Sequence, residues 1–107
     1  MIEAFFDEKD GRFSLFVNGH AGYAEVGQDI VCSAVSCLVC ALAGYIRNEC
    51  DGAKIHALGS GIASLECGAD GEDAMRMTYI GLLQLALTYP GIVSVKGDVR
   101  ARIKACV

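Results

Sequence analysis

The chain contains a run of seventeen residues, from Ile30 to Ile46, that carries no charged side chain. Its length is close to that of a membrane span, and its apolar side chains must leave water in a bilayer or in a protein core. Cysteines, serines and Gly44 interrupt the run, which favours a buried helix over a membrane helix. We therefore expect a core helix and no association with a membrane.

Apolar residues recur along this run at helical spacing. Asp29, which directly precedes it, is a typical N-cap residue because its carboxylate can accept hydrogen bonds from the first-turn amides. The helix is therefore predicted to begin at Ile30, with Cys32 as its third residue. Its predicted buried stripe consists of Ile30, Ala34, Leu38, Ala41, Leu42, Tyr45 and Ile46, widened by Val31, Val35 and Val39.

Alternating apolar residues predict one pair of strands before this helix and one pair after it. Residues 2–7 and 12–18 form the first pair, joined by a hairpin turn at Lys9-Asp10-Gly11. Residues 53–58 and 62–67 form the second pair, joined at Gly59-Ser60-Gly61. A final extended segment is predicted over residues 93–104.

A second helix is predicted between the last two of these strands. Asp70, Glu72 and Asp73 place negative charge at its start, and Pro90 stops it. The resulting order ββαββαβ indicates a two-layer α+β fold, with a mostly antiparallel or mixed sheet and both helices packed on one face. The predicted core stripe of the second helix is Met75, Thr78, Tyr79, Leu82, Leu83, Ala86 and Tyr89.

The length of 107 residues fits a single domain, 1–107. The net charge of -4 argues against a nonspecific phosphate-binding surface, so no direct nucleic-acid binding is expected. The N-terminal segment has an acid at Glu3 and lacks the basic-then-apolar order of a secretory signal, which predicts a cytoplasmic protein. In that reducing compartment the six cysteines are expected to be free thiols, most of them packed as small apolar side chains.

One histidine and one cysteine flank a glycine-rich segment between the second strand and the first helix. His20 and Cys32 are twelve residues apart, and residues 19–28 form a loop, with Gly19, Gly22 and Gly27, that is expected to be mobile. A thiol attacks as thiolate, which a helix N-terminus favours and a nearby base can generate. Closure of the loop would bring His20 to Cys32. On spacing alone, a surface His20 and a buried, unreactive Cys32 are the slightly better interpretation.

Three further residues have two interpretations each. Asp29 could orient the imidazole or only cap the helix. Ser36, one turn after Cys32 on the same face, could line the site or bond back to the Cys32 carbonyl, which is the commoner fate of a helical serine. His56, the other histidine, alternates within a predicted strand and is expected to face solvent or a dimer partner.

Taken together, the segments Gly19-His20-Ala21, Asp29-Ile30-Val31-Cys32 and Ala34-Val35-Ser36 resemble the signature of the ribosomal-processing cysteine protease family, usually called Prp, of Firmicutes and related bacteria. The resemblance extends over essentially the whole chain in length and in element order. Ser33 stands where the family is expected to have alanine or glycine, and Cys37 and Cys40 are additional thiols.

The resemblance implies a cytoplasmic cysteine endopeptidase, commonly a homodimer, that removes a short N-terminal extension from a large-subunit ribosomal protein without a cofactor or metal. It implies that Cys32 is the nucleophile and His20 the general base, with first-turn amides of the helix holding the oxyanion. Family substrates are cut within a hydrophobic extension that contains Phe-Phe, which would suit an apolar groove beneath the loop. By the resemblance, Gly19, Asp29 and Ser36 fall on family positions associated with the site, and the loop residue Gly22 is also predicted to be a supporting or substrate-binding position.

Two other classes of function remain open. Cys32, Cys37 and Cys40, spaced C-x4-C-x2-C, and the later Cys67 are similar to the plant-type [2Fe-2S] pattern, which would indicate an iron–sulfur or zinc protein. In a helix, however, Cys37 would point away from Cys32 and Cys40, which disfavours a shared metal. The second alternative is a non-catalytic module that binds a peptide or a subunit and has no reactive thiol.

Overall fold

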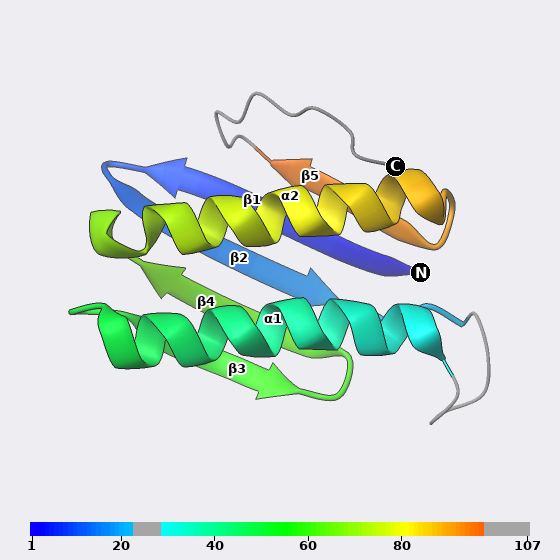
Figure 1. Cartoon of the computed structure of the whole chain (residues 1–107), viewed down its shortest axis with the longest axis horizontal. Coiled ribbons are helices and arrows are strands. Elements are labelled where there is room, and N and C mark those ends of the chain that lie inside the picture. Colours follow the sequence, from blue (N-terminus) through cyan, green and yellow to red (C-terminus); the bar gives the residue numbers. More distant parts are fainter. Residues whose placement is uncertain (23–28, 98–107) are drawn as a thin grey trace.

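The computed structural model describes residues 1–22 and 29–97 of the chain (Figure 1). Over these residues the helices and strands follow the predicted order, with a short 3-10 helix, η1, added before the second α-helix. The elements are β1 (Ile2–Lys9), β2 (Arg12–Asn18), α1 (Ile30–Glu49), β3 (Lys54–Gly59), β4 (Ile62–Cys67), η1 (Ala69–Gly71), α2 (Glu72–Thr88) and β5 (Val93–Gly97).

Among the described residues, five strands form one mixed sheet in the order β3-β4-β2-β1-β5. The pairs β1–β2, β2–β4 and β3–β4 are antiparallel, whereas β5 lies parallel to β1. β4 and β5 run in the same direction, and α2 connects them by crossing the face of the sheet over the two strands between them. Both helices lie on the same face of the sheet (Figure 1). The predicted two-layer α+β fold is confirmed.

The core lies between the sheet and the two helices. As predicted, alternation turns one face of β1 and one face of β2 inward, with Phe6 only 3% exposed and Leu15 only 1% exposed. On α1 the buried row is Val31, Val35, Val39, Leu42, Ala43 and Ile46.

The predicted stripe of α1 is therefore partly wrong. Ile30, Ala41 and Tyr45 are exposed, and the valine row that was expected only to widen the stripe is its centre. A charge-free helix is apolar on every face, so periodicity alone defines its buried side poorly. Contact with the sheet selects the face that carries the β-branched side chains.

The second helix packs much as predicted. It buries Met75, Thr78, Tyr79 and Leu82, with Tyr79 edge-on to Phe6 at a ring distance of 4.7 Å. The rest of the predicted stripe is partly buried. A Cβ atom on Gly81 would lie 3.0 Å from Leu38 of α1, so the missing side chain allows the two helices to approach closely.

The strand boundaries differ by a few residues from those predicted. β1 continues to Lys9, which leaves a two-residue turn, Asp10-Gly11, with φ angles of 53° and 75°. The second hairpin turn is likewise reduced to Ser60-Gly61, because β3 ends at Gly59. Of the predicted final segment, β5 covers Val93–Gly97. Residues 98–104, like residues 23–28 of the predicted mobile loop, lie outside the described part of the chain.

By length and composition, α1 could cross a membrane, with a mean hydropathy of 1.9. The core helix of a globular domain meets the same criterion, and α1 packs its valine row against the sheet. The helix is therefore accounted for by the fold itself.

Candidate functional site

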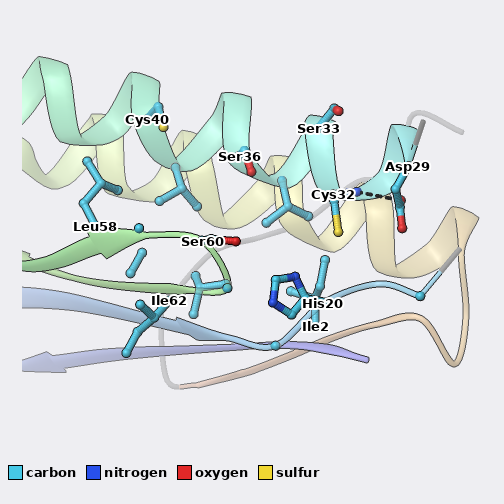
Figure 2. A pocket seen from close by; sticks show the side chains of 18 residues that line it. Ile2, His20, Asp29, Cys32, Ser33, Ser36, Cys40, Leu58, Ser60 and Ile62 are labelled. Atoms are coloured by element: carbon cyan, nitrogen blue, oxygen red, sulfur yellow. Dashed lines mark hydrogen bonds between the residues drawn. The ribbon is translucent and has the colours of Figure 1, made fainter. Parts of the chain in front are cut away.

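A cavity of about 500 Å³ lies between α1 and the β3–β4 hairpin, at the end of the sheet where β2 finishes (Figure 2). All six residues predicted to form the site line this one cavity. They come from the end of β2, the segment that follows it and the N-terminal half of α1: Gly19, His20, Gly22, Asp29, Cys32 and Ser36.

Cys32 is held at the first turn of α1 by the N-cap. The Asp29 carboxylate accepts hydrogen bonds from the amides of Val31 and Cys32, both at 3.0 Å. Asp29 is only 6% exposed, and its negative charge lies at the positive end of the helix dipole. Its capping role is therefore confirmed, and the capped first turn is the one that carries Cys32.

The Cys32 side chain is partly buried, and its sulfur points from α1 toward the sheet, on the side where His20 lies (Figure 2). The backbone N–H of Ala21 donates a hydrogen bond to the Cys32 sulfur at 3.3 Å. An N–H donor stabilises a sulfur atom that carries negative charge. The residue that follows His20 thus contacts the thiol directly. Of the simpler interpretation, the exposed His20 is confirmed, whereas the full burial expected for Cys32 is wrong.

His20 is exposed and rests on the turn of the β3–β4 hairpin. A Cβ atom on Gly61 would lie 2.6 Å from the imidazole Nε2, so the ring occupies the space that a side chain would take there. The neighbouring Gly19 N–H donates to the Gly61 carbonyl at 2.9 Å. Gly19 has a φ of 104°, and a Cβ atom there would collide with the Met1 carbonyl, so this position requires glycine.

The remaining predicted residues are arranged along the cavity. Gly22 has a φ of 64° and open space around it, consistent with a bend after the contact at Ala21. Ser36 lies one turn beyond Cys32 and lines the cavity, as one of its two interpretations predicted. Ser33, the residue that departs from the family pattern, is exposed beside it.

Beyond Ser36 the cavity continues as an apolar groove. The cavity as a whole is lined by residues of α1, β1, β2 and the β3–β4 hairpin (Figure 2). Cys32 and Cys40, at its two ends on α1, are eight residues apart, which is about 12 Å along the helix axis. The apolar lining residues are Ile2, Val17, Val35, Val39, Leu58, Ile62 and Ala63.

The four cysteines of the predicted metal pattern do not converge. α1 is helical through Cys32, Cys37 and Cys40, and the last two are exposed. Cys67 is buried at the end of β4, next to Cys50 at the far end of α1. Within residues 1–22 and 29–97, no group of three or more His, Cys, Asp or Glu side chains is placed to hold a metal ion.

The other histidine faces solvent, as one of its two interpretations predicted, and does not line the cavity. His56 is exposed, at the point where the pairing of β3 with β4 shifts in register. Its Nε2 lies 3.7 Å from the Glu66 carboxylate on β4.

Sequence reasoning missed two parts of this site. The Ala21 amide is a backbone group, which no residue pattern identifies as a donor to sulfur. The turn Ser60-Gly61 was predicted only as a hairpin connection. Its contact with His20 joins residues 41 positions apart, so no local signal could have indicated it.

Comparison with known proteins gives the family and the fold of this chain. The family model described as cysteine protease Prp matches residues 1–94. Two crystal structures of an essential ribosomal processing protease Prp from S. aureus, one with a covalently linked product peptide and one with a substrate peptide, are 18% identical to the chain. They match with TM-scores of 0.75 and 0.71, over 92% of this chain and 100% of theirs. SMU.848 from Streptococcus mutans matches with 25% identity and a TM-score of 0.63, over 91% of this chain and 93% of its own.

A search among curated proteins gives no match. The family model nevertheless covers most of the chain, including every element of the cavity. Membership of a cysteine protease family argues against the two alternatives, a metal-binding cysteine protein and a non-catalytic module. The chain is therefore a cysteine protease and belongs to the Prp family.

Proposed function

We propose that this protease removes a short N-terminal extension from a large-subunit ribosomal protein, with Cys32 as nucleophile and His20 as general base. One observation carries the assignment of residues. The Ala21 N–H donates to the Cys32 sulfur in the same cavity that the adjacent His20 lines, so thiol, donor and imidazole share one accessible space.

In the proposed mechanism, His20 takes the thiol proton and the Cys32 thiolate attacks the scissile carbonyl carbon. His20 then gives the proton to the leaving amine, and water hydrolyses the thioester. His20 and Cys32 line the same cavity, and the Cys32 sulfur points toward the side where the imidazole lies (Figure 2).

The oxyanion of the tetrahedral intermediate needs N–H donors near the sulfur. The first-turn amides expected for this purpose are already engaged by the N-cap. Those of Val31 and Cys32 donate to the Asp29 carboxylate, and that of Ser33 donates to the Asp29 carbonyl at 3.1 Å. We assign the role instead to the Ala21 amide, which already lies at hydrogen-bond distance from the atom that bonds to the carbonyl carbon.

The groove supports an extended, apolar peptide as substrate. About 12 Å of groove between Cys32 and Cys40 accommodates three to four residues of an extended chain, at roughly 3.3 Å per residue. Its valine, leucine and isoleucine walls favour apolar side chains on that side of the scissile bond. The S. aureus relative is described as a ribosomal processing protease in complex with a substrate peptide, which supports a peptide as the substrate of this chain.

The test is to mix the purified protein with an N-terminally extended large-subunit ribosomal protein and to measure the masses of the products. We expect one cut within an apolar segment of the extension. Full-length substrate after prolonged incubation with fresh, reduced enzyme would contradict the proposed substrate. A library of apolar peptides would then identify the segment that is cleaved.

The proposal includes a cytoplasmic location and a homodimer. The location is supported by five cysteines that are free thiols among the described residues. The dimer is supported by the family resemblance and is tested by light scattering at several protein concentrations. A single monomeric mass at all of them would contradict it.

A further inference from the structure

We propose that the turn of the β3–β4 hairpin, and Gly61 in particular, is the positioning element of His20. This inference rests on the proposed function, in which His20 is the general base. It assigns a role in catalysis to a residue that contacts the base and does not itself touch the reacting atoms.

Gly61 makes two contacts with the segment that carries the base. Its carbonyl accepts the Gly19 N–H at 2.9 Å, which ties the backbone next to His20 to the hairpin. Its Cα faces the imidazole, because a Cβ atom there would lie 2.6 Å from Nε2, 3.0 Å from Cε1 and 3.3 Å from Cδ2. One residue therefore fixes both the backbone and the ring.

The ring needs such a support because His20 is exposed. An exposed side chain without a neighbour samples several rotamers, which reduces the fraction of time that it spends in the productive position. With any residue other than glycine at position 61, the ring would have to move away from the new Cβ atom. Its Nε2 would then lie at least 3.4 Å from that atom, the distance of ordinary contact, instead of 2.6 Å. A displacement of about 1 Å in a reacting group can cost about 100-fold in rate.

The same hairpin also lines the substrate groove. Leu58, Ser60 and Ile62 contribute to the walls of the cavity, with Gly61 between them (Figure 2). A peptide in the groove therefore contacts the element on which the base rests. Binding of the peptide and placement of the imidazole are mechanically connected through this turn.

The chain offers a matched control for the test. Gly11 in the β1–β2 turn has the same φ of 75° as Gly61, but a Cβ atom there meets nothing within 4 Å. Gly11→Ala and Gly61→Ala carry the same backbone strain in a two-residue hairpin turn. Only Gly61→Ala places a methyl group against His20.

We expect Gly61→Ala to lower kcat by about 10- to 100-fold, with KM within about threefold of wild type, and to shift the pH–rate profile. We expect Gly11→Ala to retain wild-type kcat and an unchanged profile, although both variants lose a similar amount of thermal stability. Equal kcat values for the two folded variants would overturn the inference.

His20→Ala separates this inference from the proposed function. If His20→Ala retains wild-type activity, His20 is not the base and the proposed function fails. If His20→Ala is inactive and Gly61→Ala is fully active, only the positioning role fails. A measurement on the wild-type protein keeps the test decisive should Gly61→Ala not fold: a nuclear Overhauser effect between the His20 ring protons and the Gly61 α protons is expected, and its absence would overturn the contact.

Discussion

The two ends of α1 each carry a cysteine, and the two thiols have opposite surroundings. At the N-terminal end, the Cys32 sulfur lies in a cavity and accepts a hydrogen bond from the Ala21 amide. At the C-terminal end, Cys50 is the C-cap residue, and burial raises the pKa of its thiol, with the Asp70 carboxylate raising it further. The helix dipole adds to this contrast, because it favours negative charge at the first turn and disfavours it at the last.

Cys67 strengthens the contrast at the C-terminal end. Its side chain is fully buried next to Cys50, and a Cβ atom on Gly71 would lie 2.6 Å from the Cys67 sulfur and 3.2 Å from the Cys50 sulfur. Burial raises the pKa of Cys67 to about 11. Cysteine is thus a small core side chain at the C-terminal end of α1 and a thiol that lines a cavity at the N-terminal end. The position of each cysteine in the fold determines whether its thiol can react.

The largest expected effect separates the two ends by activity. Cys32→Ala should reduce peptide cleavage by about 1,000-fold or more, because it removes the attacking sulfur. Cys50→Ala should leave kcat within about threefold, since its thiol lies at the opposite end of α1. Steady-state cleavage of a fluorogenic apolar peptide measures both, and comparable activity of the two variants would break the comparison.

The second prediction concerns thiol reactivity. With limiting iodoacetamide at pH 7, Cys32 should be alkylated about 10-fold faster than Cys37, although Cys37 is the more exposed of the two. Cys50 and Cys67 should react most slowly because their pKa values are raised. Peptide mapping by mass spectrometry measures the order. If exposure alone controlled the rates, Cys37 would be modified first.

The third prediction tests the cap that holds Cys32. Asp29→Ala removes the acceptor for two first-turn amides and should lower the free energy of unfolding by about 1–2 kcal/mol. For a domain of this size, that change corresponds to a decrease in Tm of roughly 4–8 °C per kcal/mol. Asp29→Asn should recover part of the stability because its side-chain oxygen still accepts. Thermal unfolding that is unchanged in Asp29→Ala would contradict the capping role.

The effect that is smallest at neutral pH is a pH dependence of stability from the C-terminal end. The pKa of Cys67 rises from 9.0 to about 11 on folding, so the native state holds its proton more tightly than the unfolded chain. The resulting stabilisation is complete below pH 9 and is lost as the pH rises toward 11.

Cys67→Ala should therefore lose less stability than wild type between pH 9 and pH 11. Urea unfolding at a series of pH values measures the difference, and Cys37→Ala, at an exposed position, serves as the control. Parallel stability curves for wild type and Cys67→Ala would show that the Cys67 thiol does not contribute.

The local sequence determined the element order, the inward faces of β1 and β2, and the cap at Asp29. Each of these follows from residues close in the chain. Apolar residues alternate with period two along the strands, and the Asp29 carboxylate accepts hydrogen bonds from amides within three residues of it. The same local logic identified Cys32 and His20 as candidates.

The buried face of α1, the parallel pairing of β5 with β1 and the contacts that complete the site were decided by the tertiary structure. An evenly apolar helix has no preferred side until a sheet covers it. The donor to the Cys32 sulfur is a backbone amide, and the support of His20 is a glycine 41 residues away, so neither carries a mark in the sequence. Residue types determine which chemistry is available to this chain, whereas long-range packing determines which of its six cysteines can use it.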